Sequence, residues 1–270
     1  MERTIIREYI NDKFKDIEFL EEGHQYYING VEYTPVSNVI SEYENDTDWD
    51  SVAKNYATKN NRTVEDVKRE WELKNLKSTI AGTRTHKFGE SYTNLVSGRP
   101  DLICGENLPQ YIKKYNALVS TYPKEDAVKK FYDEHRFDLI PVGAEFRLSS
   151  KYIPDSRHIC GTCDILFWQE DVLNPENSGY VIGDWKTNKS LENDFNRKFN
   201  KTMKKPFGDL VDEPLSHYTL QFNLYQRMLE SVGVDIIGRK LIWLLDSGDY
   251  KIYEIPKLDD KLIDEVFRIH

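Results

Sequence analysis

The sequence lacks any long apolar run. No stretch approaches the roughly 18 apolar residues that a membrane span needs, and the first residues, Met-Glu-Arg-Thr-Ile-Ile-Arg-Glu, lack the apolar segment of a secretion signal. We therefore expect a protein that stays in the cytoplasm and has no membrane partner. Internal repeats, low-complexity tracts and Gly/Ser/Pro-rich linkers are also missing from the 270 residues, so we expect a single domain.

Cysteine is scarce, with Cys104, Cys160 and Cys163 only. An odd count without a secretion signal argues against a disulfide framework. Cys160 and Cys163 have the spacing of half a zinc site, but no second Cys or His pair stands at a matching distance. We expect all three to be buried and inert. The Gly-x-x-x-x-Gly-Lys-Ser/Thr phosphate loop is missing too, so any unwinding of DNA would need a separate partner.

Positive charge is in deficit, since the net charge is −9. Taken alone, this argues against a nucleic-acid partner. The charge is uneven, however, because residues 197–205 (RKFNKTMKK) are locally basic. Two interpretations of this segment are open. It is either a solvated loop or a region that contacts phosphate through Lys201, Lys204 and Lys205.

Two strand-like segments carry the most informative residues. Residues 161–168 and 180–187 are rich in β-branched and aromatic residues, yet they contain Asp164, Asp184 and Lys186. Side chains alternate along a strand, so Asp184 and Lys186 share one face. Charged residues are disfavoured inside a buried strand, whereas an exposed edge strand would accept them without any function. Two carboxylates beside a lysine suit a divalent cation that activates water against a phosphodiester.

The remaining patterns predict a mixed α/β fold. A hairpin is expected over 24–33, with Asn29-Gly30 at its turn and a helix start after it. Helices are expected over 51–60, 63–79, 82–96, 106–121 and 214–232, and near the C-terminus. Strands are expected over 142–148, 240–245 and 250–255, besides the two segments above. This order indicates a mixed central β-sheet flanked by helices.

Five motifs in a consistent order resemble those of the PD-(D/E)xK nuclease superfamily, and within it the RecB-like exonuclease branch often found in phages. They are Gly82-Thr83-x-x-His86, Glu145, Gly161-Thr162-x-Asp164, Asp184-Trp185-Lys186-Thr187 and Gln221-x-x-x-Tyr225. Each is weak alone, but their order and predicted elements match the family. The resemblance implies a restriction-endonuclease-like core over 81–257, preceded by a hairpin and helical extension over 1–80 and followed by a helix over 258–270.

The resemblance also implies a role for each motif residue. The metal ligands would be His86, Asp164, Asp184, Glu145 and the backbone carbonyl of Trp185. Lys186 would position or activate the attacking water, and Gln221 and Tyr225 would hold the DNA strand or Lys186. One or two Mg²⁺ or Mn²⁺ ions are implied. Some relatives carry an iron–sulfur cluster, but here no cysteine precedes His86 or follows Tyr225, so we expect no cluster.

The sequence therefore favours a stand-alone, metal-dependent deoxyribonuclease, and an exonuclease before a structure-specific or nicking endonuclease. A non-catalytic DNA-binding or assembly protein is an alternative of another class. If the strand is held by stacking, Trp185 is a candidate, although it should point away from the metal face. His217 and Glu90 match no motif. Cleavage polarity, strand preference, oligomeric state and pathway stay open, as do partners from DNA recombination or replication; a phage-encoded chain would work in the host cytoplasm.

Overall fold

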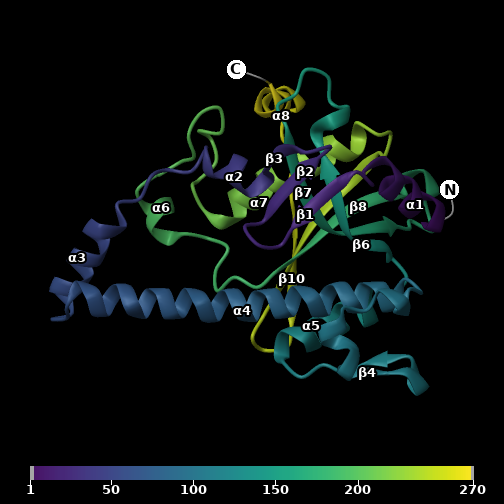
Figure 1. Ribbon diagram of the computed structural model, residues 1–270, viewed down its shortest axis with the longest axis horizontal. Helices are drawn as coiled ribbons and strands as arrows, with labels where there is room; N and C mark the ends of the chain where they lie inside the picture. Colours follow the sequence, from purple (N-terminus) through teal and green to yellow (C-terminus); the bar gives the residue numbers. More distant parts are fainter. Residues whose placement is uncertain (1–2, 269–270) are drawn as a thin grey trace.

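The computed structural model describes residues 3–268 and shows an α/β architecture (Figure 1). One sheet contains strands in the order β1-β2-β3-β7-β8-β9-β10, and β6 pairs with β7 off this path. The strands are β1 Ile17–Leu20, β2 Gln25–Ile28, β3 Val31–Pro35, β6 Leu139–Ser149, β7 Ile159–Gln169, β8 Gly179–Lys186, β9 Ile236–Leu244 and β10 Tyr250–Glu254. A separate small sheet pairs β4 Tyr111–Ile112 with β5 Ala117–Leu118. The expected mixed sheet flanked by helices is confirmed.

The helices cover both faces of the large sheet. They are α1 Arg3–Lys13, α2 Val36–Ser41, α3 Trp49–Lys59, α4 Val64–Val96, α5 Pro123–His135, α6 Asp194–Lys198, α7 Pro214–Glu230 and α8 Asp260–Phe267. Short 3₁₀ helices lie at η1 Pro100–Leu102, η2 Gly105–Gln110, η3 Lys113–Tyr115, η4 Ser150–Tyr152 and η5 Pro175–Asn177. Of the helix expected over 258–270, the last two residues lie outside the described part of the chain.

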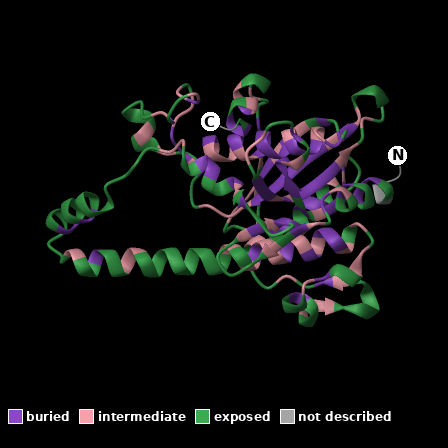
Figure 2. Cartoon of the chain, turned by 45° about the horizontal axis from the view of Figure 1, so that its top comes forward, coloured by how far each residue is buried: buried purple, intermediate pink, exposed green. Residues whose placement is uncertain are grey.

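The centre of the sheet is buried between two apolar clusters. On β8, Ile182 packs in the cluster that contains Leu220 and Leu224 of α7. Its neighbour Val181 packs in the cluster that contains Phe88 of α4 and residues of α5. Strand β8 runs antiparallel to β7 and parallel to β9. The alternation expected for a buried strand is therefore present, and it gives the sheet an α7 face and an α4/α5 face. Figure 2 shows the buried residues gathered in the sheet.

The helix α4 differs from the prediction, because the helices expected over 63–79 and 82–96 are one continuous helix. Thr63 caps it, accepting a hydrogen bond from the Asp66 amide at 3.1 Å. Gly82 does not interrupt the helix, although glycine costs about 1 kcal/mol relative to alanine inside a helix. A β-carbon at Gly82 would lie 3.2 Å from Oγ1 of Thr187, so glycine lets α4 approach the end of β8 closely.

Of the other local predictions, the hairpin is confirmed and one helix is wrong. The hairpin is confirmed, with Asn29 and Gly30 both in the left-handed region that its tight turn requires. The helix expected over 106–121 is wrong: this stretch forms η2, η3 and the β4–β5 pair. Pro109 lacks an amide hydrogen, and Asn116 takes a left-handed conformation, so a continuous helix cannot form there. Helices α1 and α5 were not anticipated.

The N-terminal half of α4 extends beyond the body of the molecule as an arm (Figures 1 and 2). Helix α3 folds back on it, with Ala53, Ala57 and Val67 forming a small buried cluster. Leu73, Leu76 and Ile80 are exposed along the arm. Among the described residues, no helix combines the length and apolar character needed to cross a membrane.

Candidate metal centre

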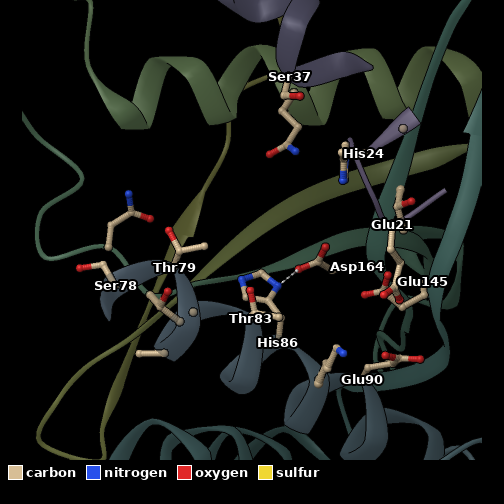
Figure 3. A pocket seen from close by; sticks show the side chains of 18 of the residues that line it. Glu21, His24, Ser37, Ser78, Thr79, Thr83, His86, Glu90, Glu145 and Asp164 are labelled. Atoms are coloured by element: carbon tan, nitrogen blue, oxygen red, sulfur yellow. Dashed lines mark ion pairs between the residues drawn. The ribbon is translucent and has the colours of Figure 1, made fainter. Parts of the chain in front are cut away.

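Neighbouring strands bring the two aspartates together. The register pairs Ile165 of β7 with Gly183 of β8, so the next position along each strand places Asp164 beside Asp184. His86 reaches them from α4, with its Nδ1 3.0 Å from Oδ2 of Asp164 (Figure 3). One ligand atom from each of these three residues lies within 4.8 Å of the others. We call His86, Asp164 and Asp184 the triad.

Lys186 belongs to the same cluster through Asp184. Its Nζ lies 2.7 Å from Oδ2 of Asp184 and 4.3 Å from the centre of the Tyr218 ring. Trp185, between them in sequence, is 1% exposed and packs in the opposite core with α5. The alternation predicted for this strand is therefore present. The burial of Trp185 also rules out the suggested stacking of its ring on a DNA base.

The buried oxygen Oδ1 of Asp184 supports a cation at the triad. Asp184 is 3% exposed, and this oxygen has no hydrogen-bond partner in the described structure. A buried carboxylate oxygen without a partner is costly, and a bound ion is one explanation for such a group. Mg²⁺ and Mn²⁺ favour carboxylate oxygens, and an imidazole nitrogen is acceptable to Mn²⁺. The donor set of the triad therefore fits a divalent cation.

The charges of the triad are strongly coupled. Burial, and then the negative charge of Asp164, raise the pKa of Asp184 well above its usual value. Burial would also raise the pKa of Asp164, but the His86 ring outweighs it and holds that pKa below its usual value. For Lys186, burial opposes the charged form, yet the two aspartates prevail and raise its pKa. In the metal-free chain, one carboxyl thus tends to keep a proton while Lys186 stays an ammonium ion.

A pH dependence of metal binding follows from the raised pKa of Asp184. Because this pKa is higher in the folded chain, the stability it contributes is present below the unfolded pKa and is lost as pH rises through the folded pKa. A cation needs the deprotonated carboxylate, so binding becomes more favourable over the same rise. We expect the increase in Tm caused by Mn²⁺ to grow from about pH 5 to about pH 8. Thermal unfolding across this range measures it, and a pH-independent increase would contradict the assignment.

A pocket of about 1100 Å³ opens over His86 and Asp164. Asp184 and Lys186 lie beneath its lining. Glu145 lines the pocket too, in a left-handed conformation within β6 with φ of 55°. Such a conformation is strained for glutamate, and strain of this kind collects at functional sites. Glu145 is exposed by surface area, but the protein atoms around its carboxyl desolvate it, and this burial, followed by the charge of Asp164, raises its pKa. It lies beside the triad and is not a member of it.

Gln221 and Tyr225 of α7 line the same pocket. The side-chain amide of Gln221 donates a hydrogen bond to the Tyr225 hydroxyl at 3.1 Å. Oε1 of Gln221 is buried without a partner in the described structure. Burial raises the pKa of the Tyr225 hydroxyl, which therefore stays protonated. The structure thus brings this motif to the pocket wall, with one amide oxygen free to accept a hydrogen bond.

Gly161 allows Tyr225 to take this position. A β-carbon at Gly161 would lie 2.7 Å from Cε1 of Tyr225 and 2.9 Å from Val36. We expect Gly161→Ala to displace Tyr225 and to cost about 1–3 kcal/mol of stability. Gly105→Ala is a matched control, because nothing lies within 4 Å of a β-carbon there. Equal stability of both variants in urea unfolding would show that this contact is unimportant.

The structure places the predicted phosphate-binding lysines elsewhere. Lys201, Lys204 and Lys205 are exposed but do not line the pocket, and Lys204 faces Asp46 at 3.6 Å. The lysines that do line it are Lys77, Lys87, Lys124 and Lys189. Lys77 and Lys87 belong to α4, Lys124 to α5, and Lys189 follows β8, so no local pattern distinguishes them in the sequence.

Two residues set aside by the sequence reasoning lie at or near the pocket. Glu90 lines it, and burial raises the pKa of its carboxyl. The Cys104 thiol donates to Oε2 of Glu90 at 2.9 Å. The expectation that all three cysteines are buried is therefore wrong for Cys104, which is half-buried, and right for Cys160 and Cys163. His217 contacts Asp212 at 2.7 Å, away from the pocket lining.

Comparison with known proteins gives limited information. No family model matches the chain, and no curated protein matches it. Solved structures do match, among them the crystal structure of a protein from Eubacterium rectale described as "Putative exonuclease". It is 12% identical, with a TM-score of 0.36, over 66% of this chain and 60% of that one. The chain thus spans less than two thirds of that protein, and a likeness of this degree assigns neither family nor activity.

Proposed function

We propose that this chain is a divalent-metal-dependent deoxyribonuclease with a PD-(D/E)xK site, and that it acts as an exonuclease. One observation carries the proposal: the triad meets at a pocket, with Lys186 2.7 Å from Asp184 and with a buried oxygen of Asp184 left without a partner. Carboxylates, an imidazole and a buried ammonium group at one point suit the binding of a cation and the cleavage of a phosphodiester.

The residues of the site have separate tasks in this proposal. His86, Asp164 and Asp184 hold the cation, with Glu145 and the Trp185 carbonyl as further candidates. A bound Mg²⁺ or Mn²⁺ polarises a phosphoryl oxygen and lowers the pKa of water. Lys186 keeps its proton beside Asp184, so it serves as a positive charge and hydrogen-bond donor toward the phosphate or the attacking water, rather than as a proton acceptor.

The pocket wall orients the substrate strand. Gln221 and the protonated hydroxyl of Tyr225, which are hydrogen-bonded to each other at 3.1 Å, supply polar groups at this wall. Lys77 and Lys189 line the pocket and supply positive charge for phosphate groups, in a chain whose net charge is −9. Lys124 lines it too, with its Nζ 3.2 Å from Asp246. Acidic residues line the pocket as well, so the phosphate groups would be held by these lysines together with the bound cation.

Linear and covalently closed circular DNA distinguish an exonuclease from an endonuclease. We expect linear DNA to be degraded with Mg²⁺ or Mn²⁺ and not with EDTA, and closed circles to stay intact, because an exonuclease needs an end. Cleavage of closed circles would show that the chain is an endonuclease that uses the same site. Binding of both substrates without any cleavage, whatever the metal, would favour a DNA-binding protein and overturn the proposal.

A further inference from the structure

Two phenylalanines at α6 stand out in the exposed surface. Phe195 and Phe199 are each 57% exposed, and their ring centres lie 4.7 Å apart. Their spacing of four residues places them on one side of the helical turn. Single exposed apolar residues are common on protein surfaces, but two adjacent aromatic rings form a patch that suits a binding partner.

The position of α6 is fixed by contacts on its other side. The Arg197 guanidinium donates to both carboxylate oxygens of Glu213, at 2.8 and 2.7 Å, and Glu213 is buried. The Asn193 side chain caps the helix, accepting from the Asn196 amide at 3.1 Å. The rings are therefore held outward by an anchored helix, and their exposure is a defined feature of the surface.

Lysines accompany the two rings. Nζ of Lys201 lies 5.0 Å from the centre of the Phe195 ring, and Nζ of Lys198 lies 5.7 Å from that of Phe199. Aromatic rings beside mobile positive charges are the combination that single-stranded nucleic acid binds, through base stacking and phosphate contacts. The basic segment 197–205 therefore has surface groups of the kind that bind single-stranded nucleic acid, although it lies outside the pocket.

The two sides of the pocket differ in the residues that line them. Ser78 and Thr79 lie on one side of the His86–Asp164 contact, and Glu21 and Glu90 lie on the other (Figure 3). Lys77 and Lys189 also line the pocket. Lys87, which lies near Glu90 on α4, is engaged by Glu106 at 2.7 Å.

The chain runs from Lys189 directly into α6, which lies above the N-terminal half of α4 in Figure 1. Ser78 and Thr79 belong to this half of α4. The carboxylates at the other end of the pocket repel phosphates. A DNA strand is therefore favoured over Lys77, Lys189 and α6.

We propose that Phe195 and Phe199 form a stacking platform for single-stranded DNA, at the end of the pocket where Lys77 and Lys189 lie. The inference rests on the proposed function, because the strand on the platform is the one whose phosphodiester reaches the triad. It assigns a binding role to a surface outside the metal site.

The test compares Phe195→Ser/Phe199→Ser with Phe137→Ser. Phe137 is a matched control because it is 73% exposed and has the Arg136 guanidinium 4.6 Å from its ring centre, but it lies between α5 and β6. Binding of a fluorescent oligothymidylate of about 20 nucleotides is measured in EDTA, so that no cleavage occurs. We expect the double variant to bind about tenfold more weakly or worse, from loss of stacking, and the control to bind like the parent.

A second measurement separates this inference from the proposed function. Mn²⁺-dependent hydrolysis of bis(p-nitrophenyl) phosphate, which is too small to reach α6, should be unchanged in the double variant. Parent-like oligonucleotide affinity with intact hydrolysis would overturn the platform and leave the nuclease standing. A change in oligomeric state with unchanged affinity would also overturn it, in favour of a contact between chains. A parent that neither binds DNA nor hydrolyses the phosphodiester would remove both proposals.

Discussion

Asp184→Asn is expected to lower metal-dependent cleavage of linear DNA by about a thousandfold or more. Asparagine keeps the size of the side chain but removes the charge that a cation requires. Among the described residues, Oδ1 of Asp184 is a buried oxygen of the triad that has no hydrogen-bond partner, so a bound cation would satisfy it. Cleavage rates at saturating Mn²⁺ measure the effect, and the rise in Tm with Mn²⁺ should vanish in the same variant.

Asp50→Asn is the matched control for this substitution. Asp50 also pairs with a lysine, Lys68, at 2.6 Å, but it is exposed on the arm. We expect parent-like cleavage and a parent-like rise in Tm with Mn²⁺. If Asp184→Asn kept both properties while folding normally, the triad would not be the metal site.

Lys186→Met is expected to reduce cleavage by about a hundredfold to a thousandfold while metal binding is kept. Methionine is close to lysine in length and lacks its charge. Without Lys186, the carboxylate of Asp184 loses its partner at 2.7 Å, so the metal-free protein should become less stable. A bound cation replaces that partner, and the Tm should recover with Mn²⁺. Removing a nearby positive charge also favours cation binding.

The two measurements distinguish a catalytic role of Lys186 from a structural one. Loss of Mn²⁺ binding together with cleavage would mean that Lys186 only organises the site. Unchanged cleavage would remove its proposed role altogether. Lys68→Met, which breaks the exposed pair with Asp50, should leave cleavage, metal binding and Tm close to those of the parent.

The parts of the fold that depend on local pattern could be predicted from the sequence. Alternation along β8 predicts that Asp184 and Lys186 share a face and that Trp185 points away, as the structure shows. The turn at Asn29-Gly30 is specified by two residues that tolerate the left-handed conformation. These features need no knowledge of distant contacts.

The features that depend on distant contacts could not be predicted. Gly82 looks like a helix boundary until Thr187 is placed against it, 3.2 Å from a hypothetical β-carbon. The strand sequence alone also does not show that Trp185 is buried between β8 and the helices α4 and α5. The same applies to the pocket lysines, Lys77, Lys124 and Lys189, which come from separate elements. Tertiary packing decides each of these cases, and local propensity does not.

Titration of Mn²⁺ into the parent protein and into Asp164→Asn/Asp184→Asn, followed by calorimetry, tests the metal centre most directly. We predict that the parent binds one or two ions with release of protons, because Asp184 must give up the proton that its raised pKa retains. The double variant should bind none at the same concentrations and should be unable to cleave DNA. Equal Mn²⁺ binding by both proteins, or DNA cleavage by the double variant, would show that the triad is not the catalytic metal centre.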